Sequence, residues 1–367
     1  MTSRKPHLII LALLAALALF AAGCGDDAED TEDTVATDAT TEEEDGEETS
    51  TTEADEETTT EPTEEEAEGD GEAIRIALVT PSATNDVAFS QSMADALAAI
   101  GETVTIDLDT TDNQFVVEDA AAVIRGYADD GYDLVIAHGS QYGALVEEIA
   151  PDFPEVSFAW GTETNTFDLD NVFAYTVRSD EGGYVMGALA AELSESGTLG
   201  VVGPVDVGDA ALYVDGFEAG AAAQNPDINV AVTWTDSFSD VALASEAATA
   251  HIGNGADALT GSAQMVTGAT GVAAEEGVPW FGTQANQTSL AEEVVVASQV
   301  YHWEVILAEM LAMISEGTLG GEVFTLTLDN GGLVVEYNDA FDLPEEIQAL
   351  GEDTTAGIAD GSITTGV

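Results

Sequence analysis

Positive charge is scarce in this sequence: 5 lysine and arginine residues stand against 72 aspartate and glutamate residues, and no lysine follows Lys5. Of the acidic residues, 24 lie between positions 26 and 72 and 48 follow, where the cationic side chains are Arg75, Arg125 and Arg178. Three arginines cannot assemble a basic patch, so we expect no nucleic-acid partner. So many negative charges repel one another and destabilise a compact fold. Molar salt shortens the Debye screening length to about 3 Å and weakens this repulsion, so the composition predicts halophilic adaptation.

Cysteine is limited to Cys24, which excludes an internal disulfide. Arg4 and Lys5 precede an apolar run, Leu8 to Ala22, that is too short to span a bilayer, so residues 1–23 are predicted to be a cleaved export signal. The small residues before Cys24 resemble a bacterial lipobox, although Ala21 stands where lipoproteins more often carry leucine. We therefore predict a lipid anchor at Cys24 on the extracytoplasmic side of the cell membrane. The alternative is a plain signal peptide with an incidental cysteine.

Large apolar side chains are almost absent from Gly25 to Glu72, where Val35 is the exception and no aromatic residue occurs. Such a segment cannot build a core, and like charges extend it. Residues 24–72 are therefore predicted to be a disordered acidic tether. The alternative, a calcium site, would need the fixed Asp and Gly spacing of a calcium loop, which the segment lacks.

Catalytic signatures are missing as well. The sequence contains no G-x-S-x-G, no G-x-x-x-x-G-K-[ST] and no H-E-x-x-H, and Pro81-Ser82-Ala83-Thr84 stands where a G-x-G-x-x-G would follow the first strand. His138, His251 and His302 lie far apart, with no metal-ligand spacing. We expect neither an enzyme nor a cofactor nor a metal site.

Short β-rich runs alternate with amphipathic stretches from residue 73 onward. The first series places strands at Ile74–Val79, Val104–Leu108, Leu134–Ala137 and Val156–Trp160, separated by helices, with Asn85 or Asp86 available to cap the first helix. A second series alternates helices at 183–193, 212–224, 241–252 and 263–276 with strands at 199–202, 229–234, 258–260 and 279–282. This repetition predicts an α/β protein with two doubly wound parallel-sheet lobes and a ligand cleft at a hinge.

Collinear motifs resemble the BMP family, the basic-membrane-protein or PnrA-like substrate-binding lipoproteins of ABC transporters. The opening motif is Ile76-Ala77-Leu78-Val79-Thr80 followed by Asn85-Asp86-Val87-Ala88-Phe89-Ser90-Gln91-Ser92. Others follow in order up to about Met313, including Glu181-Gly182-Gly183-Tyr184, Gly216-Phe217-Glu218-Ala219-Gly220, Asp236-Ser237-Phe238-Ser239-Asp240 and Ser298-Gln299-Val300-Tyr301-His302-Trp303. Each motif is weak alone, and their order carries the resemblance.

The resemblance implies a type I periplasmic-binding-protein fold. Residues 73–179 with about 284–315 would form the N-terminal lobe, and residues 180–283 with about 316–367 the C-terminal lobe. It also implies a monomer that passes a small molecule, commonly a purine nucleoside in this family, to ABC permease and ATPase subunits. A sugar or polyol receptor and a surface sensor that feeds a signalling partner are the alternatives.

Site residues carried over from the family begin with Phe89, which would stack on the ligand, although its helical spacing equally fits a core residue. Asn85, Asp86 and Gln91 would supply hydrogen bonds, and Phe217 is the aromatic candidate of the second lobe. Where many members have a Gly-x-Asp segment, this chain has Gly282 to Gln287, which includes Gln284. Where many have lysine, Tyr301-His302 stands here.

Other candidates come from their positions at the ends of predicted strands, where ligands bind in such sheets. Arg178, at the predicted lobe crossing, is the one cation placed to pair with an anionic ligand, so a neutral or cationic ligand is favoured. For His138, a neutral residue satisfied by backbone is the equal alternative, and Trp303 fits the core better than the cleft. The strand-end candidates are His138, Trp160, Tyr175, Trp234, Phe238 and Gln264.

Overall fold

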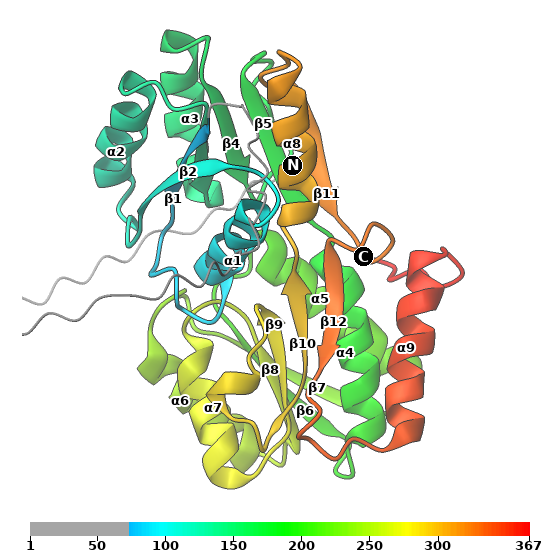
Figure 1. Ribbon diagram of the computed structural model, residues 1–367. Coiled ribbons are helices and arrows are strands. Elements are labelled where there is room, and N and C mark those ends of the chain that lie inside the picture. The colour runs from blue at the N-terminus through cyan, green and yellow to red at the C-terminus, as the bar shows by residue number, and fades with distance from the viewer. Residues whose placement is uncertain (1–72) are drawn as a thin grey trace, which may run out of the picture. The chain divides into compact units, whose positions relative to one another are not determined.

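The computed structural model describes residues 73–367 (Figure 1). The predicted signal peptide, the predicted lipid anchor at Cys24 and the predicted acidic tether all lie outside the described residues. Between residues 73 and 367, the helices are all too short or too polar to cross a bilayer.

The first sheet has strand order β2-β1-β3-β4-β5-β11, and every neighbouring pair is parallel. β3 and β4 are buried along their whole length, as expected where helices cover both faces of a parallel sheet. The elements of this lobe are β1 (Ile74–Val79), α1 (Phe89–Gly101), β2 (Ile106–Thr111), α2 (Val117–Asp129), β3 (Leu134–His138), α3 (Gly143–Ile149), β4 (Ser157–Gly161), β5 (Val172–Val177), α8 (Glu304–Ser315) and β11 (Val323–Leu326).

The second sheet repeats this arrangement with strand order β7-β6-β8-β9-β10-β12, in which β12 alone runs antiparallel to its neighbour. Its elements are α4 (Ser179–Leu193), β6 (Thr198–Gly203), α5 (Gly208–Gln224), β7 (Asn229–Trp234), α6 (Val241–Gly253), β8 (Ala258–Gly261), α7 (Val266–Glu276), β9 (Trp280–Gln284), β10 (Val295–Tyr301), β12 (Leu333–Tyr337) and α9 (Glu345–Ala359). Short 3₁₀ turns lie at Ser140–Tyr142, Ala150–Asp152 and Thr288–Leu290. The two α/β lobes expected from the sequence are therefore present.

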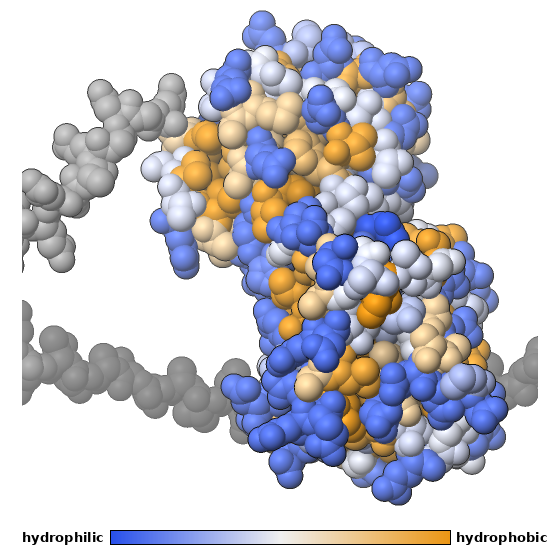
Figure 2. All heavy atoms as spheres, turned by 90° about the vertical axis from the view of Figure 1, so that its right-hand side faces the viewer, coloured by the Kyte–Doolittle hydropathy of each residue, from blue (hydrophilic) through white to orange (hydrophobic). Residues whose placement is uncertain are grey.

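Helices cover both faces of each sheet. Apolar side chains of α1, α8, α4 and α5 form one core with strands of both sheets, whereas α2 with α3 and α6 with α7 close separate cores on the opposite faces. α1 lies against α8, and α4 lies against both α5 and α9 (Figure 1). Figure 2 shows hydrophilic residues over much of one face of the molecule, in keeping with the acidic composition.

Within the described residues, the chain crosses between the sheets three times: from β5 to α4, from β10 to α8, and from β11 to β12. These crossings differ from the lobe boundaries expected from the sequence. β10 belongs to the second sheet, because its backbone pairs with β9, although residues 284–315 were expected in the first lobe. β11 belongs to the first sheet, because it pairs with β5, although residues 316–367 were expected in the second.

Candidate functional site

A cavity of about 370 Å³ lies between the two lobes. Its lining residues follow or end strands in both sheets, at the carboxyl ends where open α/β sheets bind ligands. The first lobe contributes Pro81, Phe89, Phe115, Val117, Gly139, Ser140, Gln141, Thr162 and Glu163, and the second Asp209, Ala210, Phe238, Ser262, Ala263, Gln264 and Gln284. The volume falls in the range of roughly 300–1,000 Å³ typical of small-molecule sites.

Phe89 begins α1 and lines the cavity, supported from behind by His138. The two rings stack with centroids 3.9 Å apart and planes 9° from parallel. His138 Nε2 lies 3.0 Å from the Phe89 carbonyl oxygen, which can only accept, so Nε2 carries the proton and Nδ1 accepts from the Tyr175 hydroxyl at 2.8 Å. His138 thus positions Phe89.

Burial lowers the pKa of His138 to about 3, against the smaller opposing effect of its bond to Phe89, so the ring is neutral at physiological pH. His138 is fully buried and does not line the cavity. The alternative interpretation was a neutral histidine satisfied by backbone. Here one ring nitrogen bonds the Phe89 backbone and the other bonds the Tyr175 side chain.

The aromatic residue that lines the cavity from the second lobe is Phe238, which follows β7. Phe217 lies elsewhere, because it is fully buried where α5 packs on α4 and its ring lies beside Tyr213. Three phenylalanines therefore line the cavity: Phe89 and Phe115 from the first lobe, of which Phe115 is 53% exposed, and Phe238 from the second.

A set of hydrogen-bonded polar side chains lies on the second-lobe side of the cavity. The Asp209 carboxylate, in the first turn of α5, accepts from Gln284 Nε2 at 3.4 Å and from the Tyr301 hydroxyl at 3.3 Å. The Gln284 amide oxygen in turn accepts from the Ala263 amide at 3.2 Å. Ala263 and Gln284 have φ values of +70° and +72°, a costly conformation for residues other than glycine that recurs at ligand sites.

The hydrogen-bonding candidates next to Phe89 do not line the cavity. Asp86 instead accepts the backbone amides of Ala88, Ser90 and Gln91 at 2.9–3.2 Å, and so caps the start of α1. The Gln91 side chain accepts from the Val87 amide and donates to Asp95. Asn85 is exposed. These residues hold the loop that presents Phe89.

The two tryptophan candidates also lie outside the cavity lining. Trp160 is buried, stacks on Phe167 and donates its indole N–H to the Asn165 carbonyl at 2.8 Å. The Trp234 ring is partly buried, lies over Gly203 and packs against the core. Gln264 and Gln284, by contrast, both line the cavity.

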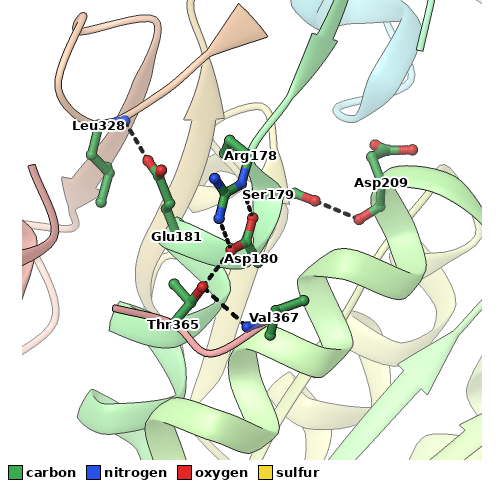
Figure 3. Close-up of polar contacts among 8 residues, drawn as sticks. All are labelled: Arg178, Ser179, Asp180, Glu181, Asp209, Leu328, Thr365 and Val367. Atoms are coloured by element: carbon green, nitrogen blue, oxygen red, sulfur yellow. Dashed lines mark hydrogen bonds and ion pairs between the residues drawn. The ribbon is translucent and has the colours of Figure 1, made fainter. Parts of the chain in front are cut away.

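Arg178 lies at the first crossing between the lobes, where the sequence placed it, but its guanidinium is already paired (Figure 3). Its Nε and Nη2 atoms donate to the two Asp180 carboxylate oxygens at 2.8 and 2.7 Å. Asp180 also accepts from Thr365 Oγ1 at 2.7 Å, and Glu181 accepts the Leu328 amide at 2.8 Å. This cation braces the crossing segments and does not line the cavity.

The second crossing carries Trp303 and His302. Trp303 is fully buried, donates to Ser92 Oγ at 2.9 Å and packs edge-on against His138, Tyr175 and Tyr301, so it is a core residue.

Over residues 73–367, no group of three or more His, Cys, Asp or Glu side chains is arranged to hold a metal ion.

Several lining residues were not identified from the sequence, namely Phe115, Ser140, Gln141, Thr162, Glu163 and Asp209. All follow the carboxyl ends of strands, which is the signal that would have found them. The strands were, however, predicted to end too early. β2 was expected to end at Leu108 but continues to Thr111, so Phe115 lies close to the end of the strand.

A family model described as ABC transporter substrate-binding protein PnrA-like matches residues 73–365. The chain is similar to a purine-binding protein of Brucella abortus (27% identity over 294 residues; 80% of this chain, 83% of the relative). It is also similar to an ABC transporter nucleoside-binding protein of Lactococcus lactis (23% identity over 314 residues; 79% and 88%). A solved ABC transporter solute-binding protein from Conexibacter woesei aligns with a TM-score of 0.68 and 26% identity over 80% of this chain and 98% of that one. Because the family match spans both lobes and the cavity between them, the chain belongs to the PnrA-like family of ABC transporter substrate-binding proteins.

Proposed function

We propose that this protein captures a purine nucleoside in the cavity between its lobes and delivers it to the permease and ATPase subunits of an ABC importer. The observation that carries the proposal is the pair of phenylalanines, Phe89 and Phe238, that line one cavity from opposite lobes. A flat heteroaromatic base inserted between them would gain stacking on both faces, worth about 1–3 kcal/mol per ring.

The support behind Phe89 favours a stacking role. His138 lies parallel to its inner face and also hydrogen-bonds its backbone carbonyl. A ring held on one face and partly exposed on the other is preorganised, which reduces the conformational entropy that binding costs.

Charge in the cavity supports a neutral or cationic ligand. Neither arginine nor lysine is among the lining residues, whereas Asp209 and Glu163 are. A phosphate or carboxylate would enter without a cationic partner and would face repulsion in a partly desolvated site. A nucleoside carries no charge, and its hydroxyl and amino groups match the amide and carboxylate side chains of Gln141, Gln264, Gln284 and Asp209.

The relatives named above as purine-binding and nucleoside-binding support the same ligand class for this chain. We further propose that the chain acts without catalysis, that Cys24 carries a lipid anchor, and that the protein works as a monomer at the extracytoplasmic face of the membrane. A sugar receptor of the same fold and a surface sensor remain the competing functions.

Thermal-shift and calorimetric titrations in molar salt test this proposal. We expect guanosine, inosine or adenosine to raise the melting temperature, because a ligand that binds only the folded state stabilises it. Phe89→Ala and Phe238→Ala should each weaken binding by roughly 5- to 150-fold.

Phe341→Ala is the matched control, since Phe341 is partly buried but lies outside the cavity lining. This variant should leave nucleoside affinity unchanged. A melting temperature that responds to glucose or other sugars and not to nucleosides would reject the nucleoside proposal.

A further inference from the structure

The Asp209 carboxylate lines the ligand cavity and accepts few hydrogen bonds from other side chains. It sits at the start of α5, directly after Gly208, whose φ of +58° turns the chain into the helix. Both of its side-chain contacts, from Gln284 and Tyr301, go to the same oxygen, Oδ2, at 3.3–3.4 Å. An ionised carboxylate accepts up to about four hydrogen bonds, usually at 2.7–2.9 Å from strong donors. Capacity for further donors therefore remains.

The electrostatic environment of this carboxylate is unfavourable without a ligand. Burial raises the pKa of Asp209, and the donors Gln284 and Tyr301 and the amides at the start of the helix offset only part of that effect. No cationic side chain lines the cavity beside it. An additional donor supplied by a ligand would compensate the desolvated charge, whereas an additional anion would worsen it.

We propose that Asp209 is the specificity-determining residue of the cavity: its carboxylate accepts a hydrogen bond from a hydroxyl or N–H group of the nucleoside and rejects phosphorylated nucleosides. This inference rests on the proposed function and adds the residue that separates nucleosides from nucleotides.

The position of Asp209 is fixed by both neighbouring crossing segments, so the carboxylate is held ready for the ligand. Ser179 Oγ, at the first crossing, donates to the Asp209 carbonyl at 2.6 Å (Figure 3). Tyr301, at the second crossing, donates to the carboxylate and receives a bond from Gln299 Nε2 at 3.2 Å. A recognition group anchored in this way loses little freedom on binding.

Calorimetry with guanosine and guanosine 5′-monophosphate on the full chain in molar salt tests the inference. The wild type should bind guanosine at least about 100-fold more tightly than the monophosphate, because like charges placed together at a binding site cost several kcal/mol. Asp209→Asn keeps the shape of the side chain but removes its charge. It should lose roughly 10- to 100-fold in guanosine affinity, the usual worth of a hydrogen bond to a charged group, and should discriminate less against the monophosphate.

Asp206→Asn is the matched control, because Asp206 is exposed in the loop just before α5, carries the same charge and does not line the cavity. It should behave as the wild type. Equal effects of the two variants would reduce Asp209 to a part of the general negative field and overturn the inference. Unchanged affinity and discrimination in Asp209→Asn would also overturn it, while leaving the proposed function standing. Absence of guanosine binding by the wild type would overturn both.

A measurement on the wild type covers the case in which the Asp209 variant does not fold. Guanosine affinity should fall on acidification as Asp209 takes up a proton, since only the carboxylate form accepts on both oxygens. The titratable groups to consider are Tyr301 on β10, which bonds to this carboxylate and whose pKa burial raises, so that it stays a donor throughout, and Glu163, which lines the cavity from the first lobe. Affinity that is constant from pH 8 to about pH 4, or a decline abolished by Glu163→Gln, would contradict the role of Asp209.

Discussion

His302 shows how a single residue at a crossing segment couples charge to stability. It follows β10, and its Nδ1 lies 2.6 Å from a Glu304 carboxylate oxygen while its Nε2 lies 3.5 Å from Glu336. The ion pair with Glu336, and then the hydrogen bond and charge of Glu304, raise the pKa of His302 to about 9 against the opposing effect of burial. This imidazolium adds a positive charge to a part of the chain that has three arginines.

The sign of the resulting pH dependence follows from linkage. Because the folded-state pKa of His302 exceeds its unfolded value of about 6.5, its stabilisation is complete below pH 6.5 and is lost as pH rises through about 9. After allowance for solvent screening, we expect the free energy of unfolding to fall by about 1–2 kcal/mol between pH 6.5 and 9.5.

Urea titrations of the wild type and His302→Gln over this pH range measure the effect. The variant should lack most of the decline. His138 and His251 do not confound the comparison. Burial lowers the pKa of both, so the pH dependence that they give to stability is confined to the range below pH 6.5. A variant that keeps the full decline would show that His302 is not its source.

Helices α4 and α5 pack so closely that only glycine fits at some positions of their contact. A Cβ on Gly187 would clash with the Phe217 carbonyl oxygen, and one on Gly220 with the Tyr184 carbonyl oxygen. The backbones therefore approach directly at these glycines, which buries Phe217 between the helices. This packing explains why Phe217 is a core residue.

Gly187→Ala is expected to destabilise the protein by about 1–3 kcal/mol, because backbone must move to admit the methyl group. Gly271→Ala in α7 is the control, since a Cβ there meets nothing within 4 Å. It should be neutral or stabilising by about 0.5–1 kcal/mol, as alanine favours helix over glycine. Thermal unfolding distinguishes the two, and equal melting temperatures would refute the close-packing argument.

The sequence predicted the repeated α/β elements well, with β1 and β7 at their observed bounds. It predicted Phe89, Gln264 and Gln284 at the cavity, because strand ends and the family motif point there. It could not separate Phe217 from Phe238, since helical spacing does not tell which face of α5 meets α4. The exchange of β10 and β11 between sheets was also missed, because pairing partners depend on tertiary contacts that a local pattern does not contain.

At the scale of the whole molecule, hydrogen bonds connect the cavity to the segments that cross between the lobes. Asp209 contacts Ser179 at the first crossing, and Asp180 joins that crossing to Thr365 (Figure 3). Asp209 also contacts Tyr301 at the second crossing. A ligand that draws Phe89 and Phe238 together would act on lobes linked by these segments, which is the geometry of hinge closure. Halophilic adaptation remains a prediction from composition, and it is the reason for molar salt in each assay.

The structure of the protein crystallised with guanosine is the most direct test of the central claim. We predict density for the base between Phe89 and Phe238, with a ligand hydroxyl or N–H within about 3 Å of the Asp209 carboxylate. Guanosine bound outside this cavity, or stacked on neither phenylalanine, would contradict the account.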